Sequence, residues 1–68
     1  MDQIIITLNG EKTQTKATDI LRLLESLKLQ PTDVIVELNG TVLHKNEFPS
    51  TKITPQDNIE ILRFIGGG

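Results

Sequence analysis

Residues 34–40 of the chain read VIVELNG, and this stretch decides the fold that the other residues complete. Its β-branched start is typical of a strand. The Asn39-Gly40 pair suits a two-residue hairpin turn, because both central positions of that turn need a positive φ. Residues 41–44 would then run back beside the first strand. The stretch therefore predicts a β-hairpin.

The same signal stands near the start of the chain, where residues 4–10 read IIITLNG. Period-two alternation places Ile4, Ile6 and Leu8 on one face of this strand. Residues 11–16 are polar and include two lysines, which hinder pairing with other chains, so they predict a return strand at a sheet edge. A second hairpin therefore opens the fold.

A helical period replaces the strand pattern between Thr18 and Lys28. Thr18 is a good N-cap, and the negative charge of Asp19 suits the first turn of a helix. Pro31 marks the end of the helix. The expected apolar stripe consists of Ile20, Leu21, Leu23, Leu24 and Leu27.

The C-terminal third contains a crossing segment, a turn and a last strand. Residues 45–54 show no clear period, and we expect Phe48 and Ile53 to anchor them in the core. Residues 54–57, TPQD, form a turn with proline at its second position. The apolar residues 59–65 predict the final strand.

The predicted order is therefore β-β-α-β-β-β, and a single helix can cover only one face of a mixed sheet. The first and last strands are the most apolar, so we place them at the centre of the sheet. This is an α+β fold, the ubiquitin-like β-grasp. We expect a β-grasp domain over residues 1–65 and a flexible glycine tail over residues 66–68.

Length and composition exclude several classes of function. A domain of 68 residues has a modest core with little room for an enclosed active site. The net charge of −2 and the sequence pI near 5.2 argue against nucleic acid and anionic membranes as partners. No apolar run approaches the roughly 20 residues that span a bilayer. The N-terminus lacks a basic signal region, so we expect a cytoplasmic protein that is not an enzyme.

The three terminal glycines, Gly66, Gly67 and Gly68, follow an apolar strand. Extended, they would reach roughly 10 Å beyond the fold and could enter a narrow tunnel. Another protein could use ATP to convert the terminal carboxylate into an acyl-adenylate, which a sulfur or nitrogen nucleophile can attack. The alternative is a frayed end without function. With no cysteine in the chain, sulfur could not be carried on a side-chain thiol.

Other candidate sites are weaker. Strict alternation places Leu62 and Phe64 on the face without a helix, next to Ile5, and exposed apolar patches commonly mark docking sites; the alternative is a bulge that turns one residue inward. His44 has too few partners for a metal site. Ser26 and Ser50 have no evident base, so we interpret them as solvent-facing.

The residues that carry a family resemblance are VELNG at 36–40 with Val42, Asp-x-Ile-Glu-Ile at 57–61, and Gly67-Gly68. On these residues the whole chain resembles the ThiS family, the sulfur carriers of thiamin biosynthesis. One departure is Gln56 before Asp57, where members commonly have glycine.

The resemblance implies that an E1-like enzyme adenylates Gly68 and that a thiocarboxylate then forms there, with a cysteine desulfurase as sulfur donor. Gly66 and Gly67 would thread the tail into the enzyme, and thiazole synthase would receive the sulfur. It implies no catalytic residue, metal or bound cofactor on this chain, since the activating partner uses the ATP. The alternatives are a ubiquitin-like protein modifier, a molybdopterin-synthase-type carrier, which is usually longer, and a non-reactive interaction module.

Overall fold

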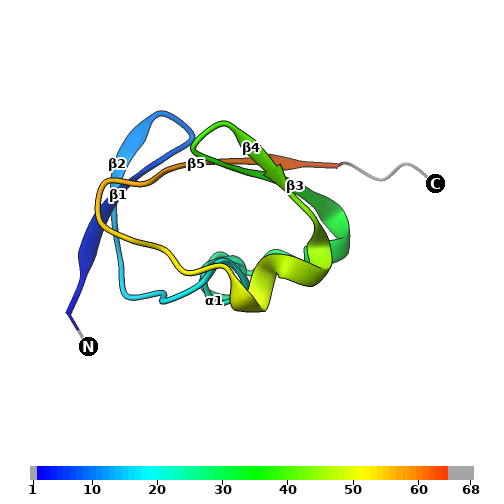
Figure 1. Ribbon diagram of the computed structural model, residues 1–68, viewed down its shortest axis with the longest axis horizontal. Coiled ribbons are helices and arrows are strands. Elements are labelled where there is room, and N and C mark those ends of the chain that lie inside the picture. Colours follow the sequence, from blue (N-terminus) through cyan, green and yellow to red (C-terminus); the bar gives the residue numbers. More distant parts are fainter. Residues whose placement is uncertain (1, 65–68) are drawn as a thin grey trace.

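The computed structural model describes residues 2–64, which form a five-stranded mixed sheet with one α-helix on it (Figure 1). The elements are β1 (Ile4–Leu8), β2 (Glu11–Thr15), α1 (Ile20–Ser26), the 3₁₀ helix η1 (Pro31–Asp33), β3 (Val34–Leu38), β4 (Thr41–Leu43), the 3₁₀ helix η2 (Lys45–Ser50) and β5 (Asn58–Arg63). The predicted α+β fold and the order of its elements are confirmed. The predicted domain end at residue 65 and the tail 66–68 lie outside the described residues.

The strand order in the sheet is β2-β1-β5-β3-β4. β5 lies in the middle, parallel to β1 on one side and antiparallel to β3 on the other. The remaining pairs, β1 with β2 and β3 with β4, are antiparallel hairpins. The expected central place of the first and last strands is confirmed, and the described chain ends just after the middle strand.

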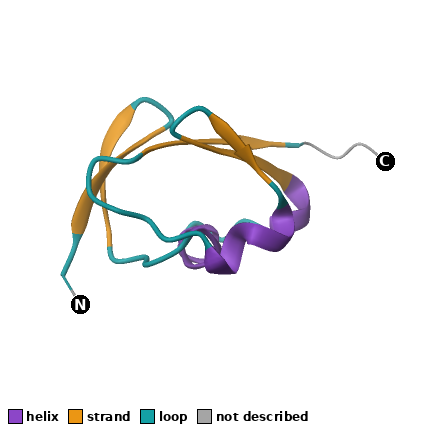
Figure 2. Cartoon of the chain, viewed as in Figure 1, coloured by secondary structure: helices purple, strands orange, loops and turns teal. Residues whose placement is uncertain are grey.

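The core lies between the sheet and the layer formed by α1 and η2 (Figure 2). Inward-facing residues of β1, β3 and β5 meet the buried side of α1 and the aromatic ring of Phe48. Phe48 and Ile53 are both buried, so the crossing segment is anchored as predicted. The buried apolar side chains are Ile6, Ile20, Leu23, Leu24, Val34, Val36, Phe48, Ile53 and Ile59.

Helix α1 differs from the prediction at both ends. Asp19 is the N-cap in place of Thr18, because its carboxylate accepts a hydrogen bond from the backbone N–H of Arg22 at 2.8 Å. The helix ends at Ser26, and Lys28 then takes a φ of 61°, a left-handed conformation that is common just past helix C-termini. Leu27 therefore lies beyond the last helical turn and is 40% exposed, so its predicted place in the buried stripe is wrong.

Both Asn-Gly turns form as predicted. Asn9 and Gly10 have φ values of 50° and 85°, and Asn39 and Gly40 have 52° and 87°. Positive φ at both central positions defines the type I′ turn, whose twist matches that of the flanking strands.

The predicted strand ends need small corrections. β2 and β4 each end one residue early, and β5 starts at Asn58 and stops at Arg63, before the predicted end at residue 65. The backbone N–H of Phe64 donates instead to the carbonyl of Asp33 in η1, at 2.8 Å. β3 begins at Val34, which is opposite Arg63, so β3 has no residue that could pair with Phe64.

Candidate functional site

The face of the sheet opposite α1 carries exposed apolar side chains. Ile5 of β1, Leu62 of β5 and Phe64 just after β5 are 49%, 64% and 51% exposed. The exposure of Ile5 and Leu62 follows from the alternation of the strands, since their inward-facing neighbours Ile6 and Ile61 contribute to the core. No bulge turns any of the three inward, and their role in docking stays a prediction.

Ile35 belongs to the same face, although the sequence analysis did not single it out. It is 38% exposed, lies between two buried valines of β3, and pairs directly with Leu62 in the sheet register. A continuous run of apolar residues gives no period that separates inward from outward positions. Ile5 faces the same side but lies at the other end of the sheet. In the parallel ladder Thr7 is opposite Asn58, and the carbonyl of Ile5 accepts from the N–H of Gln56, so the structure does not bring Ile5 together with Leu62. The three side chains Ile35, Leu62 and Phe64 are called the apolar patch below.

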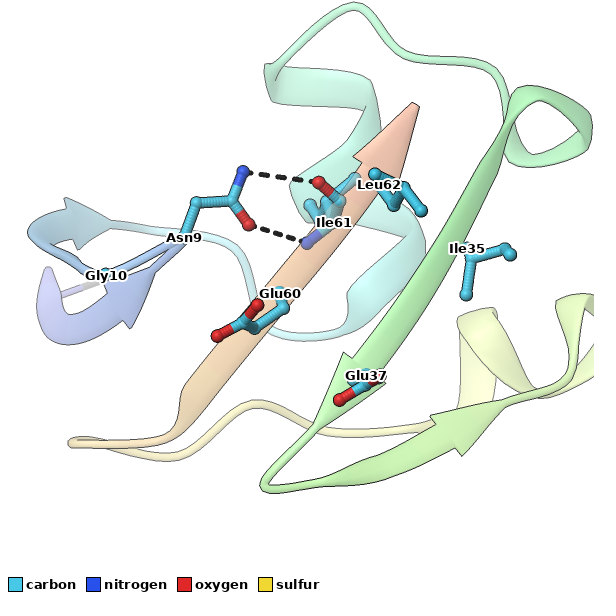
Figure 3. A pocket seen from close by; sticks show the side chains of 7 residues that line it. All are labelled: Asn9, Gly10, Ile35, Glu37, Glu60, Ile61 and Leu62. Atoms are coloured by element: carbon cyan, nitrogen blue, oxygen red, sulfur yellow. Dashed lines mark hydrogen bonds between the residues drawn. The ribbon is translucent and has the colours of Figure 1, made fainter. Parts of the chain in front are cut away.

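A shallow groove runs over this face beside the apolar patch (Figure 3). Glu37 and Glu60 are direct cross-strand partners on β3 and β5, so two carboxylates lie side by side next to the Ile35–Leu62 pair. Neither carboxylate forms an ion pair within residues 2–64, where Arg22 pairs with Asp19 and Glu25. The lining consists of Asn9, Gly10, Ile35, Glu37, Glu60, Ile61 and Leu62. The face is thus apolar at one end and acidic in its middle.

Asn9 forms one wall of the groove and holds β5 in place (Figure 3). Its backbone N–H donates to the carbonyl of Ile59 at 2.9 Å. Its side-chain carbonyl accepts from the N–H of Ile61 at 2.7 Å, and its side-chain NH₂ donates to the carbonyl of Ile61 at 3.2 Å. The side chain therefore pairs with β5 as a strand backbone would.

Asn39, at the equivalent position of the second turn, holds the start of β5. Its side-chain carbonyl accepts from the N–H of Asn58 at 2.8 Å, and its NH₂ donates to the carboxylate of Asp57 at 3.0 Å. Asp57 also accepts from the N–H of Thr54 at 2.8 Å, across the turn that precedes β5. Both asparagine turns thus close on the central strand.

These contacts change the acidity of Asp57. Partial burial by itself raises the pKa of this carboxyl, because the charged form loses solvation. The hydrogen bonds from Thr54 and Asn39 outweigh this effect and hold the pKa below its ordinary value of 3.8. Asp57 is therefore a structural carboxylate of the turn.

The other polar candidates have local structural partners. The hydroxyl of Ser26 donates to the carbonyl of Leu23 at 2.7 Å, and the hydroxyl of Ser50 donates to that of Glu47 at 3.2 Å. Both serines are exposed. The exposed His44 precedes η2, and its backbone N–H donates to the carboxylate of Glu47 at 2.8 Å. Within residues 2–64 no cluster of side chains could hold a metal ion, and no helix is long and apolar enough to cross a membrane.

Comparison with known proteins gives this face its context. The ThiS family matches residues 3–68, nearly the whole chain. The chain belongs to the ThiS family. It is 35% identical over 66 residues to the sulfur carrier protein ThiS of Bacillus subtilis. The matched segment covers 94% of this chain and 100% of that protein. This chain is a ThiS-family sulfur carrier of thiamine biosynthesis, as the sequence resemblance implies.

A solved ThiS structure has the same architecture. The crystal structure of the thiamine biosynthesis protein ThiS from Geobacter metallireducens matches with a TM-score of 0.80 and 36% identity, over 96% of this chain and 100% of that one. The predicted β-grasp is thereby confirmed.

A third relative of the ThiS-family chain is a larger protein. The thiazole synthase of Magnetococcus marinus is 38% identical over 64 residues, which are 93% of this chain but only 20% of that protein. A segment of that thiazole synthase is therefore similar to this chain.

Proposed function

We propose that the C-terminal carboxylate of Gly68 carries the sulfur, as a thiocarboxylate that is donated to the thiazole ring of thiamine. The observation that carries this proposal is that the match to a family of sulfur carriers runs to Gly68 in a chain without cysteine. With no thiol side chain available, sulfur would be held in an acyl linkage to a carboxylate, and the terminal carboxylate is the one that the family resemblance implies. Glycine leaves its acyl carbon unhindered for attack.

The chemistry needs an activating partner, because a carboxylate is a poor electrophile. In the proposed sequence, an E1-like enzyme joins the Gly68 carboxylate to the α-phosphate of ATP and releases pyrophosphate. A sulfur nucleophile then attacks the acyl carbon and displaces AMP. If the donor is a cysteine desulfurase persulfide, a thiol reductant must afterwards cleave the sulfur–sulfur bond. A requirement for ATP agrees with the cytoplasmic location that the sequence predicts.

The apolar patch is the proposed docking surface for these partners. Ile35 and Leu62 are direct cross-strand partners on β3 and β5, and Phe64 stands four positions before Gly68. A partner bound here would therefore have the C-terminus within reach of its own active site. Gly66 and Gly67 would pass through the entrance to that site, where side chains would obstruct them.

Thiazole synthase is the proposed acceptor. The thiazole synthase of Magnetococcus marinus includes a segment similar to this chain, and fused proteins often correspond to partners that associate as separate chains. The proposal therefore extends that association to the present carrier.

Intact-mass measurement tests the proposed function. The carrier is produced together with the adenylating enzyme and cysteine desulfurase of its own organism. We expect a gain in mass equal to the difference between sulfur and oxygen, and no gain in a variant that lacks Gly68. If the wild-type carrier keeps its mass with a competent enzyme, the proposal is wrong. Covalent adducts on lysines of other proteins would instead favour a ubiquitin-like modifier.

A further inference from the structure

The central strand has unequal support along its two edges. On one side, β3 pairs with β5 over five residues, from Leu38 opposite Ile59 to Val34 opposite Arg63. On the other side, the parallel pairing with β1 covers only Asn58 and Ile59, because β1 then turns away into its hairpin. Beyond Ile59 the β1-facing edge of β5 needs another partner.

The amide of Asn9 is that partner. Backbone groups of alternate residues in a strand point toward the same neighbour, so Ile59 and Ile61 both face β1. The backbone N–H of Asn9 takes the carbonyl of Ile59, and its side chain takes both the N–H and the carbonyl of Ile61. One residue thus extends the support of β5 by two positions toward the C-terminus.

Ile61 stands at an important place for the proposed reaction. Leu62 of the apolar patch follows it directly, and Phe64 follows two residues later. On the β1 side, Ile61 is the residue of β5 nearest the C-terminus that forms hydrogen bonds with Asn9. The residues that lead to Gly68 follow it in the chain.

We propose that Asn9 is a positioning residue for the carrier reaction: its amide fixes Ile61, so that the apolar patch and the start of the tail reach the activating enzyme in one arrangement. This inference rests on the proposed function, since it assumes that a partner docks on the patch and uses Gly68. Asn9 itself takes no part in bond making or breaking.

The competing interpretation is that Asn9 serves only its turn. Asparagine is favoured at this position, where φ is 50°, whatever its side chain contacts. Asn39 provides a matched control, because it occupies the same place in the same turn type with a φ of 52°. Its amide also makes two hydrogen bonds to β5 and the turn before it. These bonds are to Asn58 and Asp57, at the start of β5, whereas Ile61 lies toward its C-terminal end.

The experiment compares Asn9→Gly with Asn39→Gly, since glycine keeps each turn and removes only the amide. Two quantities are measured: the free energy of unfolding in urea, and the KM and kcat for carrier-dependent ATP–pyrophosphate exchange by the cognate adenylating enzyme. We expect both variants to lose stability. Only Asn9→Gly should lower kcat/KM, by about fivefold to tenfold, which is the size that one or two lost hydrogen bonds allow.

Amide hydrogen exchange separates positioning from a direct contact between Asn9 and the enzyme. In free Asn9→Gly carrier, the N–H of Ile61 should exchange faster relative to the core amide of Ile59, and Asn39→Gly should leave this ratio unchanged. An unchanged Ile61 ratio in Asn9→Gly, or equal losses of kcat/KM in the two variants, would overturn the proposal. Failure of the proposed function is distinct, because it is measured on the wild-type carrier alone, which would then gain no sulfur in the intact-mass measurement.

Discussion

At the scale of single residues, left-handed backbone positions decide much of this fold. The asparagines and glycines of the two hairpin turns adopt positive φ at little cost, but Lys28 and Gln56 do so as well, with φ values of 61° and 71°. A side chain with a Cβ is disfavoured in this conformation by roughly 1–2 kcal/mol. Gln56 stands where the family resemblance leads one to expect glycine, so the chain carries strain at that turn.

Replacing Gln56 by glycine should therefore stabilise the protein. The relief of the left-handed strain exceeds the entropy that glycine adds to the unfolded chain, and we expect a net gain of about 0.5–1 kcal/mol. Urea unfolding measures it, with Gln56→Ala as the control that keeps a Cβ. Equal stabilities of the glycine and alanine variants would contradict this explanation.

Asp57 should make stability depend on acid pH. Because its pKa in the folded state lies below the ordinary value of 3.8, the charged form stabilises the fold above that pH. This contribution is lost as the pH falls through the folded-state pKa. The difference in unfolding free energy between wild type and Asp57→Asn should therefore shrink as the pH is lowered below 3.8. A difference that stays constant from neutral pH to acid would show that the carboxylate charge is not involved.

At the scale of elements, the strands pair by local signals and by contacts that no local signal contains. The two Asn-Gly dipeptides fixed both hairpins in advance, since a type I′ turn needs those residues. The hydrogen bonds between the Asn9 side chain and the Ile61 backbone join residues 52 positions apart, and no residue near Asn9 in the sequence indicates them. The residue types predicted Thr18 as the N-cap, and only the backbone path shows that Asp19 takes this position. Ile35 was hidden within a uniformly apolar strand.

The pair of carboxylates across β3 and β5 should cost stability. Like charges directly opposite in a sheet repel each other, so we expect Glu60→Gln to raise the unfolding free energy by a few tenths of a kcal/mol, about 0.2–0.5. The gain should diminish at high salt. Glu11→Gln is the control, because Glu11 lies opposite Leu8 and not opposite another acid. A gain of the same size in the control would indicate a general effect of net charge.

At the scale of the whole molecule, the sheet divides the protein into a packed side and an open side. α1 and η2 cover one face (Figure 1), and the side chains of the apolar patch are exposed on the other. The alternation of β1 and β5 was enough to predict this division from the sequence, including the exposure of Ile5 and Leu62. The open face is the surface that we propose for recognition by partners, and the described chain ends at Phe64 of its apolar patch.

Substitution of Leu62 should separate docking from folding. Leu62→Ala removes an exposed side chain, so stability should change little, whereas affinity for the adenylating enzyme should fall about tenfold if the patch is a binding hot spot. Leu27→Ala is the matched control, since Leu27 is an exposed leucine just after α1, on the covered side of the sheet. Isothermal titration calorimetry gives both affinities. Equal affinities of the two variants would remove the patch as the docking surface.

The central claim is that sulfur is held at Gly68, and fragment-ion mass spectrometry tests it most directly. The carrier is isolated after reaction with ATP, its adenylating enzyme and the sulfur donor, and the intact chain is fragmented. The account predicts that the added mass of sulfur in place of oxygen appears only in fragments that contain Gly68. The added mass located on any fragment that lacks Gly68, or absent from a carrier that its enzyme has adenylated in the presence of the donor, would contradict it.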